Sequence, residues 1–155
     1  MDTYLIVKTI HIVSSCILLG TGIGIAFFMF RSYFTDNINE KFFAVRNTVL
    51  ADYIFTFPAV ILQPVSGIWL VWKIGYEWSV FWLVSTYFLF AVIGFCWLPV
   101  VWIQIQLRRI IQHSMETKTE LPKKYNRLMK IWFLFGWPAF FSLLLIFYLM
   151  VAKPV

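Results

Sequence analysis

Four stretches of the chain are long and apolar enough to cross a lipid bilayer, and they limit what it can fold into. They cover residues 4–30, 52–73, 78–105 and 131–152. A spanning helix needs about 20 mainly apolar residues. Only helices and closed barrels satisfy their backbone groups in lipid, and unbroken apolar runs of this length are typical of helices. The chain is therefore predicted to be an all-α integral membrane protein.

The segments between these stretches leave no room for a soluble domain. Hydrophobic residues make up 61% of the chain and charged residues only 13%, and the short connection "KIGYEW" joins the second stretch to the third. Helices joined by short connections pack antiparallel to their neighbours. We expect residues 1–155 to form a single integral membrane domain, a transmembrane antiparallel four-helix bundle surrounded by the lipid bilayer.

The basic residues predict which way the bundle faces. Short loops rich in Lys and Arg stay in the cytoplasm, and ten of the thirteen basic residues follow the first or the third stretch. Only Lys8, Lys73 and Lys153 lie at the other side. Both termini are therefore expected outside. The net charge of +6 fits contact with anionic lipid headgroups, and no nucleic-acid motif accompanies it, so no nucleic-acid partner is expected.

Two segments flanking the stretches are expected to lie at the cytoplasmic interface. The connection "RSYFTDNINEKFFAVRNTVLAD" mixes Phe with charged residues, which is compatible with a short interfacial helix. The third helix should continue along the interface through "IQIQLRRIIQHS". Asp52 begins the second stretch at the face where Arg31 ends the first, so an ion pair is expected there.

Gly20 and Gly24 form a small-xxx-small pair in the first stretch. Such pairs let two membrane helices approach closely. We interpret the pair as a packing feature, and it would also permit a homodimer.

His11 is the most unusual residue of the first stretch, because ionisable groups inside a membrane span are costly and often functional. At about 1.5 Å per residue, it lies about 10 Å below the outer end of its helix. The other histidine, His113, lies beyond the inner end of the third helix. The two cannot share one site, which excludes a bis-histidine haem within one monomer.

Counting the same depth along the other stretches places further small and polar residues around His11. They are Ser66 and Gly67, with Gln63 one turn deeper, then Ser85, Thr86 and Tyr87, and Ser142 and Tyr148. On the first helix, steps of 100° put Lys8, Ser15, Leu18 and Gly22 on the face of His11. We call His11 and the residues at its depth the His11 layer.

Three interpretations of the His11 layer stay open. In the first, neutral His11 ligates the iron of haem b. Small residues make room for the macrocycle, and Lys8 or Lys73 meets a propionate; the small residues are Ser15, Gly22, Ser66 and Gly67. In the second, His11 is hydrogen-bonded across the bundle as a structural polar clasp, and Lys8 extends outward to the interface. In the third, His11 belongs to a proton relay or contacts a quinone.

Four segments carry a resemblance to a known family: "LIVKTIHIVSSCILLGTGIG", "LQPVSGIWL", "FCWLPVVWIQIQLRRI" and "YLMVAKP". They resemble the bacterial integral-membrane family called domain of unknown function 2269, nearly end to end. That resemblance implies the bacterial inner membrane and names no activity.

More distantly, the first helix with "KTIHI" is similar to those of the four-helix membrane protoporphyrinogen oxidase and the copper-resistance D-like family. The resemblance to the oxidase implies that the helix-1 histidine is an axial haem ligand, which carries over to His11 alone. The oxidase also relies on a lysine in a later helix. Residues 78–105 contain none, which speaks against porphyrinogen oxidation.

Two functions are expected from these observations. The first is a small b-type haem protein with a redox role, in electron transfer or in oxidation of a lipid-soluble or porphyrin-like substrate. It would be a haem-dependent membrane oxidoreductase whose redox partner is not identified by the sequence. The second is a non-enzymatic membrane accessory or assembly protein, in which the His11 layer is only a clasp.

Overall fold

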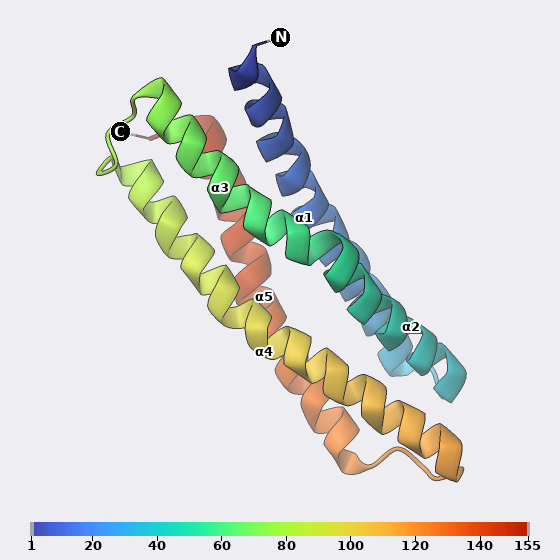
Figure 1. The fold of residues 1–155 in the computed structure, drawn as a ribbon. Coiled ribbons are helices and arrows are strands. Elements are labelled where there is room, and N and C mark those ends of the chain that lie inside the picture. The colour runs from blue at the N-terminus through green and yellow to red at the C-terminus, as the bar shows by residue number, and fades with distance from the viewer. Residues whose placement is uncertain (1, 155) are drawn as a thin grey trace.

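A computed structural model describes residues 2–154 and consists of four long helical rods (Figure 1). The first rod is α1. The second rod is continuous and consists of α2, a π-helical turn η1 and α3. The third rod is α4 and the fourth is α5. Their bounds are Thr3–Phe34 for α1, Ile38–Ala51 for α2, Asp52–Thr56 for η1, Phe57–Ile74 for α3, Phe81–Thr117 for α4 and Lys123–Ala152 for α5. All four rods are long and apolar enough to span a membrane, which confirms the predicted all-α fold.

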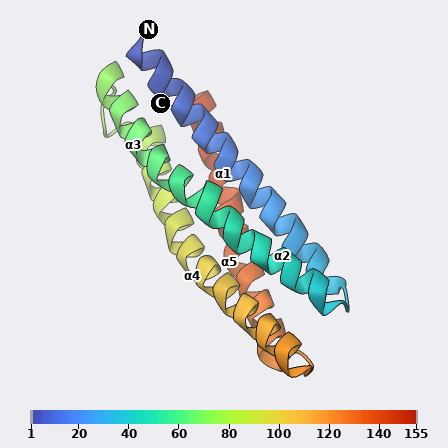
Figure 2. The same cartoon turned by 45° about the vertical axis from the view of Figure 1, so that its right-hand side comes forward.

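The rods run up and down, with both termini beside the turn that joins α3 to α4 (Figures 1 and 2). α1 packs along α3, and α4 packs along α5. The two pairs approach each other where α2 meets α4 and, to a smaller extent, where α1 meets α5. Each pair therefore forms a two-helix unit, and the units join mainly in the half of the bundle that contains α2.

The rods extend well beyond the predicted spans. The short helix predicted in this connection is present as α2, but it continues through η1 into α3 and is not a separate element. No Gly or Pro interrupts residues 38–57, so nothing breaks the helix where the charged residues begin. The π-helical turn precedes Pro58, which lacks an N–H and whose ring crowds the carbonyl four residues earlier. Widening to a π-turn accommodates that crowding and keeps the rod continuous.

The larger apolar core lies in the half of the bundle that contains α2, where α2, α4 and α5 meet the end of α1. It contains Met29, Val45, Val100, Ile103, Leu107, Ile111, Tyr125, Leu128, Met129 and Trp132. A smaller cluster of Val71, Trp82, Leu83 and Leu149 lies near the termini. Many large apolar side chains elsewhere are exposed, as expected for surfaces that face lipid.

Lys41 stabilises the turn between α1 and α2 by hydrogen bonds to the end of α1. Its side chain is buried, and Nζ donates hydrogen bonds of 3.1 Å to the carbonyl oxygens of both Ser32 and Tyr33. These carbonyls lie in the last turn of α1, where helical partners are missing. Nζ also lies 5.2 Å from the centroid of the Tyr125 ring. Lys41 is therefore a helix cap and is not free to meet headgroups.

The prediction of an ion pair between Arg31 and Asp52 is wrong. Arg31 is exposed, whereas Asp52 is only 5% exposed. The continuous rod carries Asp52 away from the end of α1 and turns it towards the interior.

The glycines of α1 make no close contact within one chain. A Cβ built on Gly20 or Gly24 would meet nothing within 4 Å. Their packing role inside the bundle is therefore not supported, and the homodimer remains a prediction.

Candidate functional site

His11 lies between α1 and α3, half-buried, with its imidazole directed at α3. Its Nδ1 lies 2.8 Å from Oγ of Ser66. Gly67 provides the space for the ring, because a Cβ built at residue 67 would lie 3.1 Å from Cε1 of His11. The predicted grouping of His11, Ser66 and Gly67 is present in the structure.

The hydrogen bonds of Ser66 determine which nitrogen of His11 carries the proton. The hydroxyl of Ser66 donates to the carbonyl oxygen of Leu62 at 2.5 Å. A hydroxyl has one proton to donate, so Oγ must accept from His11. Nδ1 of His11 therefore bears the hydrogen, and Nε2 keeps its lone pair in the neutral ring.

Gln63 and Ser14 complete the network on the other side of the ring. The amide Nε2 of Gln63 lies 3.3 Å from Nε2 of His11, where it donates to the free lone pair. The amide oxygen of Gln63 accepts from the hydroxyl of Ser14, which also lies 3.0 Å from the carbonyl oxygen of His11. We call His11, Ser14, Gln63 and Ser66 the α1–α3 clasp; each of its polar side chains has a partner.

Four other residues expected in the site do not join the clasp. Lys8 is exposed, with Nζ 5.6 Å from the centroid of the Tyr4 ring. Ser15 donates to the carbonyl oxygen of Ile12 at 2.7 Å. Gly22 and Lys73 are exposed and lie elsewhere on their helices.

Sequence reasoning missed Ser14, although it lies three residues after His11. On a helix, the residues three and four positions after His11 are both its neighbours. Only the packing against α3 determines that Ser14, and not Ser15, faces Gln63. On α4, the hydroxyl of Thr86 donates to the carbonyl oxygen of Trp82 at 2.7 Å. Within residues 2–154, no side chain of α4 or α5 is hydrogen-bonded to the clasp.

An apolar groove of about 250 Å³ runs between α1 and α3 beside the clasp. Ser14 is among its lining residues; the others are Thr9, Ile10, Val13, Ile17, Ile54, Phe55, Pro58, Ala59 and Leu62. The groove offers apolar surface and contributes only two hydroxyl groups. One of these, in Ser14, already belongs to the clasp.

The clasp fits a haem only in part. The lone pair on Nε2 of His11 is the form that binds iron. However, Gln63 occupies that position, and Gly67 lies against the ring edge. Among the described residues, no group of three or more His, Cys, Asp or Glu side chains could hold a metal ion. Haem binding therefore requires that Gln63 move and that α1 and α3 separate around the macrocycle.

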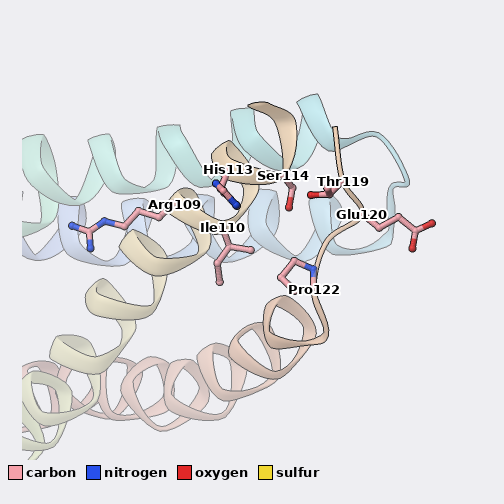
Figure 3. Close-up of a pocket in the computed structure, with 7 residues that line it drawn as sticks. All are labelled: Arg109, Ile110, His113, Ser114, Thr119, Glu120 and Pro122. Atoms are coloured by element: carbon pink, nitrogen blue, oxygen red, sulfur yellow. The ribbon is translucent and has the colours of Figure 1, made fainter. Parts of the chain in front are cut away.

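A second pocket, of about 370 Å³, lies at the opposite end of the bundle, between the end of α4 and the connection to α5 (Figure 3). His113, Ser114 and Thr119 line it, and the charged ends of Arg109 and Glu120 point away in opposite directions (Figure 3). The separation of His113 from the turns that carry His11 agrees with the prediction that the two histidines cannot share a site.

Comparisons with known proteins give one result. A family model described as "Predicted integral membrane protein (DUF2269)" matches residues 5–154. No curated protein and no solved structure matches the chain. The expected resemblance to this family is confirmed, whereas the resemblance to the oxidase and copper-resistance families is not shown.

Proposed function

This chain belongs to the DUF2269 family of predicted integral membrane proteins, and from that premise we propose that it is a non-enzymatic membrane accessory or assembly protein. The observation that carries this proposal is the α1–α3 clasp. Both ring nitrogens of His11 are engaged by side chains of α3, so the imidazole is used to join two helices. We also propose that it resides in the bacterial inner membrane with both termini outside.

A clasp of this kind has a definite energetic role. Membrane helices gain no hydrophobic free energy from meeting each other, so packing and hydrogen bonds between them decide which helices pair. Each such hydrogen bond contributes about 0.6 kcal/mol on average and up to about 1.7 kcal/mol. Two bonds to His11 thus specify the pairing and register of α1 and α3 without dominating the stability of the fold.

Replacing the histidine tests the proposal. In His11→Ala we expect α1 to pack less firmly on α3, with a loss of about 1–3 kcal/mol from the two bonds together. The measurement is reversible unfolding in mixed detergent micelles. Ser15→Ala is the matched control, because Ser15 bonds only within α1. Equal stability of the two variants would exclude the clasp.

A second candidate is the b-type haem protein with His11 as a ligand of the iron. It is supported by the tautomer, because Ser66 holds the proton on Nδ1 and leaves Nε2 with a lone pair. A hydrogen bond to the second ring nitrogen is also the usual support of a ligating histidine. The long 3.3 Å contact to Gln63 is the bond that iron would replace. Bound haem would supply one-electron redox chemistry.

Absorbance distinguishes the two candidates. Protein expressed with added haem precursor and purified in detergent should show a Soret band if His11 binds haem. His11→Ala should then lose the band, and His113→Ala should keep it. A colourless wild-type protein that nevertheless shows the stability loss in His11→Ala supports the accessory protein and rejects the haem protein.

A further inference from the structure

Asp52 is a carboxyl group enclosed within a membrane-spanning rod. It is the first residue of η1 and lies within the continuous rod Ile38–Ile74, which is long and apolar enough to span a membrane. Its side chain is 5% exposed. π-Helical turns inside α-helices occur frequently at functional sites, and Asp52 at the start of this one has two neighbours on α4, Trp97 and Gln104.

Three groups surround the carboxyl: the hydroxyl of Thr56, the indole N–H of Trp97 and the amide of Gln104. Thr56 lies one turn after Asp52 on the same rod. Trp97 and Gln104 are seven residues apart, and hence on one face of α4. Thr56 and Gln104 are 8% and 1% exposed, so water does not cover them.

Hydrogen bonding among Asp52 and these three neighbours is incomplete. Four buried atoms have no hydrogen-bond partner: Oδ2 of Asp52, Oγ1 of Thr56, Nε1 of Trp97 and Oε1 of Gln104. Two of them, on Asp52 and Gln104, are oxygen atoms that accept hydrogen bonds and cannot bond to each other. An unsatisfied buried polar group costs about 1–3 kcal/mol. Trp97 and Thr56 can donate to the carboxyl oxygens, which leaves Oε1 of Gln104 as the acceptor that still lacks a donor.

Within residues 2–154, no basic side chain pairs with Asp52. α1 carries no Lys or Arg between Lys8 and Arg31, and α4 carries none before Arg108. On α2 the nearest basic residue is Arg46, which is exposed. The titratable neighbours along these helices, Tyr53 beside Asp52, Cys96 beside Trp97 and Cys16 on α1, carry no positive charge. A buried carboxylate without a cation costs several kcal/mol, so the site must gain a positive charge from the solvent.

We propose that Asp52 is a proton-binding site. A proton taken from water forms an O–H bond at Oδ2, which removes the negative charge and turns an acceptor into a donor. That O–H then donates to Oε1 of Gln104, so one proton satisfies both acceptors. The indole N–H of Trp97 and the hydroxyl of Thr56 donate to the carboxyl group from its other side.

This site is separate from the α1–α3 clasp. Asp52 and Ser66 are fourteen residues apart on one rod, about 20 Å of helix, and the lining of the groove between them is mainly apolar. The proposal therefore does not rest on the function assigned to His11. It assigns to this chain a buried carboxylic acid that can bind and release a proton.

Infrared spectroscopy of the full chain in lipid vesicles tests the proposal. At neutral pH we expect the carbonyl stretching band of a protonated carboxylic acid. Asp52→Asn should lose that band. This variant keeps a donor for Gln104 and an acceptor for Trp97, so it should fold like the wild type. Asp36→Asn, in the exposed connection between α1 and α2, should keep the band.

Two further measurements complete the test. Gln104→Leu removes the acceptor for the acid proton, and should shift the band to higher frequency even if Asp52→Asn fails to fold. Folded wild-type protein without the band would overturn the proposal, as would a band that survives in Asp52→Asn. Loss of the band on adding Na⁺ at constant pH would instead assign the site to a metal cation and also overturn it.

Discussion

Gly67 lies against the edge of the His11 imidazole, so that a Cβ at residue 67 would be 3.1 Å from Cε1. Normal van der Waals contact between carbon atoms begins at about 3.5 Å. Ser66 holds Nδ1 of the same ring at 2.8 Å, which leaves the ring little freedom to move away. The glycine is therefore part of the geometry of the clasp, since only a residue without a side chain leaves this space.

Gly67→Ala should weaken the clasp. The methyl group pushes the imidazole outward and lengthens its bond to Ser66. We expect Gly67→Ala to be less stable than Gly22→Ala by about 1–3 kcal/mol, the usual cost of overpacking, as measured by unfolding in mixed micelles. Gly22→Ala is the control for helix propensity, because a Cβ there meets nothing within 4 Å. Equal stability would show that His11 does not lie against Gly67.

The proton on His11 should reside on Nδ1. Because Ser66 donates to the carbonyl oxygen of Leu62 and accepts from the ring, ¹⁵N NMR should show Nδ1 protonated and Nε2 unprotonated at neutral pH. Ser66→Ala removes the acceptor and should raise the fraction of the Nε2–H form, whereas Ser15→Ala should not. A wild-type ring protonated on Nε2 would contradict the direction of the hydrogen bond from His11 to Ser66.

The sequence predicts the depth of the site along the helices more readily than it predicts which residues face the neighbouring helix. Hydropathy located the four rods, and counting residues from the predicted helix ends brought His11, Ser66 and Gly67 to one level, as the structure shows. The choice between Ser14 and Ser15 could not be made in this way. Both positions lie about one helical turn after His11. Only the position of α3 determines that Ser14 makes the contact.

Asp52 was misplaced for a related reason. Charged residues indicate where the apolar stretch ends, but they do not indicate where the helix ends. Hydropathy therefore predicted the start of a helix at Asp52, which lies inside the continuous rod Ile38–Ile74. The side chain of Asp52 instead meets Trp97 and Gln104 of α4. Its neighbours Trp97 and Gln104 come from a rod more than forty residues later, and no local pattern connects them to it.

Lys41 should stabilise the turn between α1 and α2. Its ammonium group serves two carbonyl oxygens at the end of α1, and hydrogen bonds to charged groups contribute about 1.5–3 kcal/mol. Lys41→Met keeps the apolar part of the side chain and removes the donors. We expect a loss within that range by chemical denaturation, with Lys124→Met, an exposed residue, as control. A loss no larger than that of the control would contradict the capping role.

The two ends of the bundle should lie on defined sides of the membrane. The ten basic residues beyond the first and third predicted spans should keep the connection between α4 and α5 in the cytoplasm. Cysteines introduced singly at Glu77 and at Thr119, both exposed, should therefore react differently with a membrane-impermeant thiol reagent. Intact cells should label Glu77→Cys, and Thr119→Cys should be labelled only after permeabilisation. Native Cys16 and Cys96 should first be replaced by alanine. Labelling of Thr119→Cys in intact cells would show that the termini face the cytoplasm.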